Sequence, residues 1–122
     1  MDNFDTLKLN KEFRRAYGRG KNFVSGVLVS YIVPNRQNVL RVGITTGKKV
    51  GCAVKRNRAR RVITAAFREC SEHLTPGYDI VFVARSRTPL VKSQVIFKAM
   101  KQHFINCGIW NLSDEKATDK TN

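Results

Sequence analysis

At 122 residues, the chain is long enough for one domain with a modest core and too short for two. Its formal net charge of +14 comes from 23 lysines and arginines against 9 aspartates and glutamates, which predicts a polyanionic partner, most simply nucleic acid. The longest apolar runs, 27–29 and 80–84, have the length of strands, and the apolar face of the basic helix is mostly Ala, Val and Ile, which is typical of a core, so no membrane partner is expected. The glycines fit neither phosphate-loop template and therefore indicate no nucleotide binding, and no small-molecule substrate is expected.

The excess positive charge lies in one part of the chain. Between Phe13 and Arg68 there are 14 basic residues and no aspartate or glutamate, whereas the remainder has nine basic and nine acidic residues. Three cysteines, an odd number, cannot all pair within the chain. This favours a reducing, cytoplasmic location.

The first predicted element is a short helix. Residues 1–8 form a polar lead-in that we expect to be flexible. Asn10 is a good N-cap for a helix over 11–17, which Gly18 would close. Phe13 and Tyr17 are four residues apart on one face, so both rings could pack the helix against a core. Alternatively, they are platforms beside cations such as Arg14, an arrangement that grips single-stranded nucleic acid.

The remaining elements alternate between strands and helices. The β-branched run 24–33 and the run 39–46 predict two strands joined by a polar hairpin connection, and 78–84 predicts a strand buried on both faces. Helices are expected over 53–72 and 91–106, followed by a disordered tail over 110–122. The order α-β-β-α-β-α, with the first strand allowed to split, predicts an α+β two-layer sandwich in one domain, 9–109.

The helix over 53–72 has two contrasting faces. Its apolar stripe consists of Ala59, Val62, Ile63, Ala66, Phe67 and Cys70. The side chains of Asn57, Arg61, Thr64 and Arg68 fall opposite, with Arg58 and Arg60 at the flanks. Because no carboxylate alternates with these arginines, the face repels itself unless an external anion neutralises it. This pattern favours a docking surface over a solvated face.

The sequence offers no convincing catalytic or metal-binding set. The only histidines, His73 and His103, lie outside the basic region, which also lacks the carboxylates that a magnesium-dependent nuclease needs. Cys70-x-x-His73 and His103-x-x-x-Cys107 have spacings compatible with zinc. Without a CxxC knuckle, we favour buried cysteines and predict no metal site on the protein.

Several motifs together resemble a known family. They are Arg41-Val42-Gly43-Ile44, Lys48-Lys49-Val50-Gly51, Ala53-Val54-Lys55-Arg56-Asn57-Arg58, Ala66-Phe67-Arg68, Tyr78-Asp79-Ile80-Val81 and Ala84-Arg85, with Phe13 and Tyr17 upstream. Over residues 9–106 the chain closely resembles the protein subunit of bacterial ribonuclease P.

The resemblance implies a ribosomal-protein-like α/β sandwich with a left-handed β-α-β crossover, against the usual preference. It also implies binding to the catalytic RNA of ribonuclease P and to the 5′ leader of precursor tRNA. That RNA, with Mg²⁺, cleaves the phosphodiester bond to release the mature tRNA 5′ end, and the protein has no catalytic residue or cofactor of its own. By motif match, the residues facing the catalytic RNA are Lys55, Arg56, Asn57, Arg58 and Arg61, with Arg60 and Arg68 adding charge. The implied leader-binding residues are Phe13, Arg14, Tyr17, Lys48 and Lys49.

Three positions depart from the family pattern. Cys52 stands where the family usually has Asn, Gly47 replaces Ser or Ala, and Thr64 occupies a position that is often Arg. Two other functions stay open from the residues themselves. One is a general structured-RNA-binding or ribosome-associated module without a role in tRNA maturation, and the other is a free-standing ribonuclease using His73 and His103.

Overall fold

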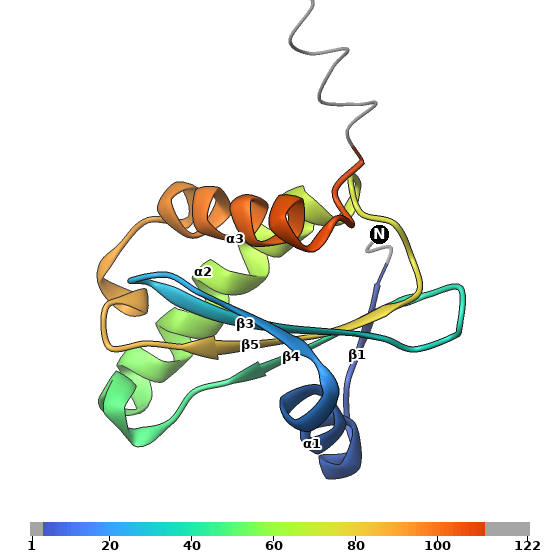
Figure 1. Ribbon diagram of the computed structural model, residues 1–122. Helices are drawn as coiled ribbons and strands as arrows, with labels where there is room; N and C mark the ends of the chain where they lie inside the picture. Colours follow the sequence, from blue (N-terminus) through green and yellow to red (C-terminus); the bar gives the residue numbers. More distant parts are fainter. Residues whose placement is uncertain (1–3, 112–122) are drawn as a thin grey trace, which may run out of the picture.

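The computed structural model describes residues 4–111, which form a five-stranded sheet with three helices (Figure 1). The strands follow the spatial order β1-β4-β5-β3-β2. In chain order the elements are β1 (Asp5–Thr6), α1 (Asn10–Arg19), β2 (Lys21–Val24), β3 (Leu28–Pro34), β4 (Leu40–Thr45), the 3-10 turn η1 (Lys48–Val50), α2 (Ala53–Ser71), β5 (Tyr78–Ala84), the 3-10 turn η2 (Thr88–Leu90) and α3 (Ser93–Cys107). The predicted α+β class is confirmed.

The strand expected over 24–33 is split into a β2–β3 hairpin. Its antiparallel register pairs Val24 with Val29. The Oγ of Ser25 accepts the backbone N–H of Leu28 at 3.1 Å, which fixes the turn between the two strands. The hairpin begins directly after α1, since Arg19 ends that helix and residues 21 and 22 already belong to β2.

β5 is the central strand, antiparallel to β3 and parallel to β4. Its predicted burial on both faces is confirmed, because Ile80, Val81 and Phe82 are all fully buried. Side chains alternate between the faces of a strand, so these three residues supply apolar surface to both sides of the sheet.

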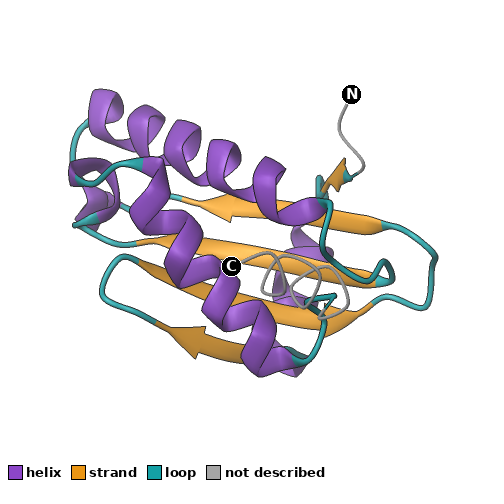
Figure 2. Cartoon of the chain, turned by 90° about the horizontal axis from the view of Figure 1, so that it is seen from above, coloured by secondary structure: helices purple, strands orange, loops and turns teal. Residues whose placement is uncertain are grey.

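Helices therefore cover both faces of the sheet. α2 and α3 lie across one face, as Figure 2 shows from above, and α1 lies against the other (Figure 1). Ile80 and Phe82 join the large core beneath α2 and α3, whereas Val81 joins a smaller core with Ala16 of α1. The expected two-layer arrangement is thus incomplete: α1 adds a partial third layer over the apolar side chains that β3 and β5 turn away from the main core.

The chain passes from β4 through α2 into the parallel, adjacent strand β5. This is the β-α-β unit for which the family resemblance implies a left-handed connection. It places the N-terminal part of α2 beside the end of β4 (Figure 1). This part of α2 contains the basic cluster, which consists of Lys55, Arg56, Asn57 and Arg58.

Both ends of the domain extend further than expected. Residues 4–8 do not form the flexible lead-in that was expected over 1–8. β1 pairs in parallel with β4, Leu7 is buried, and the centroid of the Phe4 ring lies 4.7 Å from that of Phe67. At the other end, Trp110 is buried and bridges to Leu74. The rest of the expected tail, 112–122, lies outside the described residues.

α3 has one exposed apolar residue and one buried polar residue. Val95 is 44% exposed, whereas His103 is only 4% exposed. The Nδ1 atom of His103 lies 2.7 Å from the hydroxyl of Ser30 on β3, and this hydrogen bond accounts for a polar side chain in the core. Within residues 4–111, no helix has the length and apolarity needed to cross a bilayer.

Candidate nucleic-acid interface

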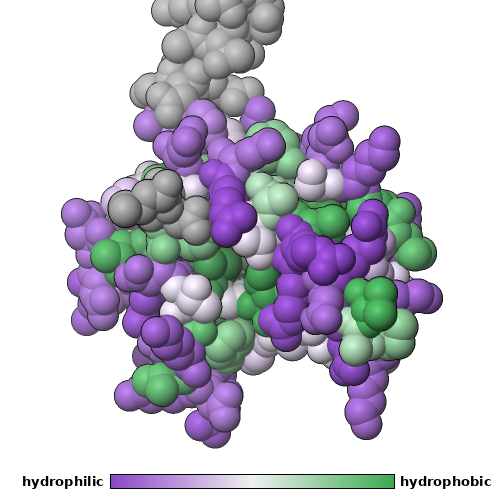
Figure 3. Space-filling model, turned by 180° about the vertical axis from the view of Figure 1, so that it is seen from behind, coloured by the Kyte–Doolittle hydropathy of each residue, from purple (hydrophilic) through white to green (hydrophobic). Residues whose placement is uncertain are grey.

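The outer side of α2 carries the arginines singled out from the sequence. Ala59, Ile63 and Phe67 are buried against the sheet, and this turns the opposite side of the helix to solvent. There, four side chains surround a shallow depression. We call them the arginine face: Arg60, Arg61, Thr64 and Arg68. Seen from behind, the molecule shows hydrophilic side chains over much of its surface, with apolar patches between them (Figure 3).

Two of the α2 arginines also make contacts within the protein. The Nε atom of Arg58 donates to the carbonyl oxygen of Pro89 at 2.6 Å, and Nη1 of Arg60 donates to that of Ile44 at 3.2 Å. Both acceptors are uncharged, so the guanidinium charges are oriented but not neutralised. Because the bond from Arg58 ties α2 to η2, part of this side chain serves the fold.

The other residues of the basic cluster lie around the first turns of α2. Lys55 and Asn57 are exposed, and Arg56 is half-buried. The aliphatic stem of Lys55 lies over Gly51, where a Cβ atom would come within 2.8 Å of the Lys55 Cδ atom. Gly51 also has φ of +127°, a backbone conformation that favours glycine. A glycine at position 51 thus allows both the backbone turn into α2 and the close approach of the Lys55 side chain.

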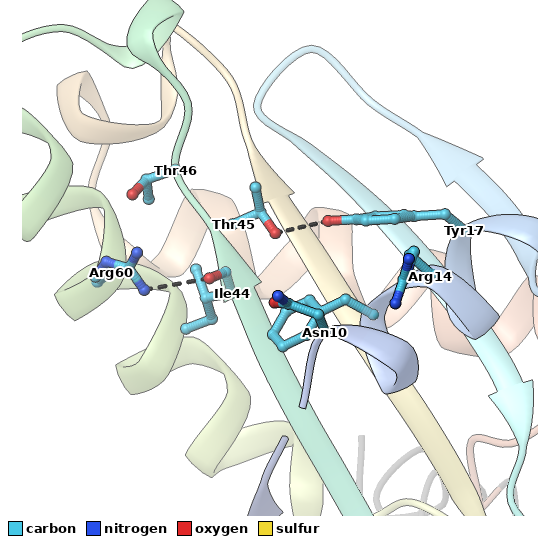
Figure 4. A pocket seen from close by; sticks show the side chains of 8 residues that line it. Asn10, Arg14, Tyr17, Ile44, Thr45, Thr46 and Arg60 are labelled. Atoms are coloured by element: carbon cyan, nitrogen blue, oxygen red, sulfur yellow. Dashed lines mark hydrogen bonds between the residues drawn. The ribbon is translucent and has the colours of Figure 1, made fainter. Parts of the chain in front are cut away.

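A cleft of about 540 Å³ separates α1 from α2 at the end of β4 (Figure 4). Arg14 and Tyr17 border it from α1, and Arg60 borders it from α2. The complete lining is Asn10, Phe13, Arg14, Tyr17, Ile44, Thr45, Thr46 and Arg60. The structure therefore brings together three of the five residues that the resemblance assigns to the leader: Phe13, Arg14 and Tyr17.

The aromatic side of this cleft depends on residues of β4 that face α1. A Cβ atom on Gly43 would come within 2.5 Å of the Phe13 Cζ atom, so the glycine is what lets the Phe13 ring lie close to the sheet. Two residues along, the Thr45 hydroxyl lies 2.6 Å from the Tyr17 hydroxyl. The Tyr17 ring also packs edge-on against Tyr31, with centroids 5.0 Å apart, while 39% of the residue stays exposed. Each ring is thus anchored against the sheet and also borders the cleft, a geometry compatible with either of the two roles considered for them.

A buried ion network fixes α1 across the sheet. The carboxylate of Asp79, 1% exposed, accepts from Nε and Nη2 of Arg41 at 2.8 Å each and from Nδ2 of Asn35 at 2.9 Å. Nη1 of Arg41 donates to Glu12 of α1 at 2.7 Å. The bond to Asp79 raises the pKa of Arg41, and the backbone N–H of Leu9 lowers the pKa of Glu12. These charges neutralise one another within the fold.

Two predicted site residues lie elsewhere, and four lining residues were missed. Lys48 and Lys49 are exposed in η1, just after the rim of the cleft, and are not among its lining residues. Arg60, expected to face the catalytic RNA, borders both the cleft and the arginine face. The missed residues are Asn10, Ile44, Thr45 and Thr46. Two polar threonines at the end of an apolar strand were the signal that could have revealed them.

The histidines and cysteines do not converge on an open site. His103 is buried and bonded to Ser30, and His73 stacks on Trp110 at 4.9 Å. Burial raises the pKa of Cys70 to about 12. Within residues 4–111, no group of three or more His, Cys, Asp or Glu side chains is placed to hold a metal ion.

Cys52 occupies a different environment from the other cysteines. It is exposed at the position preceding α2, where the backbone N–H of Lys55 lowers the pKa of the thiol. Cys52 occupies the N-cap position of α2 without a side-chain capping hydrogen bond.

The fold and the surface define a basic α+β protein with an arginine-rich helix face beside an aromatic cleft, which is the architecture of an RNA-binding protein. The ribonuclease P family model matches residues 1–108. The ribonuclease P protein component of Clostridioides difficile is 45% identical over 96 residues, covering 78% of this chain and 84% of the relative. That of Clostridium botulinum strain Langeland is 40% identical over 106 residues, covering 86% and 96%.

Solved structures agree with this assignment. The Staphylococcus aureus RNase P protein superposes with a TM-score of 0.76 at 27% identity, covering 87% of this chain and 97% of that one. A second S. aureus structure, of a mutant with defective mRNA degradation activity, also gives 0.76, at 26% identity, covering 86% of this chain and 89% of that one. The chain belongs to the ribonuclease P protein component family. It is thus a subunit of the ribonucleoprotein enzyme that processes tRNA, as the motifs predicted.

Proposed function

We propose that this protein binds the catalytic RNA of ribonuclease P through the arginine face and holds the 5′ leader of precursor tRNA in the cleft between α1 and α2. The observation that carries the proposal is the position of Arg60, which borders both surfaces. Two RNA segments bound at these surfaces would therefore meet at one side chain. The protein orients substrate and catalyst, and the chemistry belongs to the RNA.

On the arginine face, binding is electrostatic. Each lysine or arginine that neutralises a phosphate releases counterions, so affinity falls steeply with salt. A-form RNA has a deep, narrow major groove that side chains do not read, and α2 therefore recognises backbone and shape instead of sequence. Arg61 and Arg68 contribute charge at the centre of the face. Lys55, Arg56, Asn57 and Arg58 extend this contact around the first turns of α2.

In the cleft, binding combines stacking with charge. A single-stranded leader exposes its bases, and base–aromatic stacking contributes about 1–3 kcal/mol per base. Tyr17 is the more exposed of the two rings, and Phe13 lies deeper against Gly43. Arg14 stands at the rim to pair with phosphates, and Lys48 and Lys49 continue the positive charge beyond the end of β4.

We assign Mg²⁺ to the catalytic RNA. The carboxylates of Glu12 and Asp79 are already engaged by Arg41, so they are poorly suited to hold a divalent cation. When bound to the RNA, Mg²⁺ would lower the pKa of the attacking water and stabilise negative charge on the leaving oxygen. The protein lowers repulsion between RNA segments, and this reduces the Mg²⁺ concentration that activity requires. We place the assembly in the cytoplasm.

Cleavage of a precursor tRNA tests the proposal in three mixtures at low Mg²⁺: protein alone, catalytic RNA alone, and both together. Strong activity only in the combination is the expected result. A protein that binds structured RNA without stimulating cleavage would instead be a general RNA-binding module.

The mixture with protein alone tests the remaining alternative, a free-standing ribonuclease. It is needed because one S. aureus relative is a mutant with defective mRNA degradation activity. In this chain the burial of His103 and its bond to Ser30 argue against that role. Cleavage by the protein alone, retained through purification, would overturn our assignment of the chemistry to the RNA.

A further inference from the structure

A second, smaller hollow opens beside the arginine face. It has a volume of about 210 Å³ and lies between α2 and the outer edge of β4. Its lining combines four apolar residues, Phe4, Val42, Ile44 and Phe67, with four polar or charged ones, Thr6, Arg60, Thr64 and Arg68. We call it the edge notch.

The notch exists because β1 is short. With two residues, β1 pairs only with Arg41 and Val42, so the pairing along the outer edge of β4 ends before Gly43. The ring of Phe4, just before β1, leans on Phe67 and closes one end of the hollow. At the other end, Arg60 reaches across to the Ile44 carbonyl.

An apolar hollow with a cationic rim matches one ligand class closely. A nucleotide presents a flat apolar ring system on a phosphate chain, and proteins bind such groups by placing the base against aromatic and aliphatic walls while arginines hold the phosphates. Phe4 supplies a ring, Ile44 an aliphatic wall and Arg60 a guanidinium at the mouth. We propose that the edge notch receives one unpaired base of an RNA docked on the arginine face.

We assign that base to the catalytic RNA and not to the leader. The notch shares Arg60, Thr64 and Arg68 with the arginine face, whereas it shares only Arg60 and Ile44 with the cleft. The assignment rests on the proposed docking of catalytic RNA on α2. It adds to that electrostatic contact a site that requires an unpaired nucleotide at a fixed place in the RNA.

The test is footprinting of the catalytic RNA with the full-length protein, without substrate. Hydroxyl radicals report contacts to the RNA backbone, and reagents that attack Watson–Crick edges report whether a base is enclosed. Wild-type protein should protect a stretch of backbone and, within or beside it, one unpaired base. Backbone protection without any newly protected base would refute the notch while leaving the docking intact. Absence of backbone protection would refute the docking itself, and the notch with it.

Two variants isolate the hollow. Thr64→Phe places a ring into the notch and should abolish the base protection while keeping the backbone protection. Val95→Phe adds the same ring at an exposed position of α3, outside the notch and the arginine face, and should behave as wild type. Circular dichroism and the thermal midpoint verify that both variants fold. If Thr64→Phe does not fold, Phe4→Leu, which removes only the ring, should weaken the base protection.

The affinity for catalytic RNA gives an independent readout. Thr64→Phe should bind about tenfold more weakly than wild type, within the range expected for one stacked base. Deleting the protected nucleotide from the RNA should cost the wild type a similar factor and cost Thr64→Phe almost nothing, because both changes remove the same contact. Additive losses would place the base elsewhere. Protection that appears only on the leader of a bound precursor would contradict the assignment to catalytic RNA.

Discussion

The two sides of the sheet use arginine in opposite ways. Beneath α1, Arg41 is bonded to Asp79 and Glu12, so its charge is neutralised inside the protein and holds the helix in place. On α2, Arg58 and Arg60 donate to backbone carbonyls, which orient the guanidinium groups without neutralising them. The comparison shows that net charge alone does not identify a binding surface. The binding surface is marked instead by arginines such as Arg58 and Arg60, whose hydrogen bonds go to uncharged carbonyl oxygens.

This contrast predicts that substitutions on the two sides of the sheet affect different properties of the protein. Changes in the α1 network should lower the stability of the fold. Changes on α2 should lower RNA affinity at nearly constant stability. The four predictions below run from the largest expected effect to the smallest.

Asp79→Ala should destabilise the protein by about 3–5 kcal/mol, because it leaves the partly buried Arg41 without its main partner. Chemical denaturation measures the loss. Arg61→Ala, an exposed arginine on the opposite side, is the matched control and should stay within about 0.5 kcal/mol of wild type. Equal destabilisation by the two changes would contradict the distinction between a stabilising ion network beneath α1 and exposed arginines on α2.

Gly43→Ala should cost about 1–3 kcal/mol of stability, because the new methyl group overlaps the Phe13 ring. By lifting that ring from the sheet, it should also weaken the preference for precursor over mature tRNA. Gly47→Ala is the control, since a Cβ atom there would meet nothing within 4 Å. An unchanged preference in Gly43→Ala would mean that the depth of Phe13 does not matter for the leader.

Arg61→Ala should weaken binding to catalytic RNA several-fold and make the plot of log affinity against log salt less steep by about 0.9, the value for one phosphate contact. Titrations at several salt concentrations measure both quantities. Arg58→Ala should have a mixed effect, because its bond to Pro89 also ties α2 to η2. A slope unchanged in Arg61→Ala would remove that residue from the interface.

Stability should also fall modestly as the pH drops below the ordinary histidine pKa of about 6.5. Burial lowers the pKa of His103 in the folded protein, so the unfolded chain takes up the proton first and is favoured as the pH decreases. The loss continues down to the lowered pKa of the folded state. Denaturation midpoints at pH 7 and pH 5 measure it, and His103→Gln should flatten the difference. The lowered pKa of Glu12 acts separately, because the stability it adds is lost only below about pH 4.5.

The sequence was most informative where one helix face was regular. The stripe through Ala59, Ile63 and Phe67 predicted both the burial of α2 and the direction of its arginines, because helical periodicity alone fixes them. The cleft was predicted only in part. Phe13 and Tyr17 were identified from their spacing and from the family resemblance, but their partners Gly43 and Thr45 depend on strand register.

Other features could not be predicted because they arise from tertiary contacts. β1 has only two residues, too few for any periodic signal, and its pairing with β4 depends on the burial of Leu7. The same holds for His103, whose burial depends on Ser30 of β3, 73 positions away. The third layer formed by α1 was missed because a continuous apolar strand shows that both faces of β5 are covered but not by which helix.

The most direct test of the account compares Arg61→Ala with Phe13→Ala in the reconstituted complex. Affinity is measured for the catalytic RNA alone and then, for the assembled complex, for precursor and mature tRNA. Arg61→Ala should weaken binding of the catalytic RNA and leave the precursor-to-mature ratio unchanged. Phe13→Ala should leave binding of the catalytic RNA unchanged and reduce that ratio about tenfold, the loss of one stacked base. Parallel losses in both measurements by both variants would contradict a protein with two separate RNA surfaces.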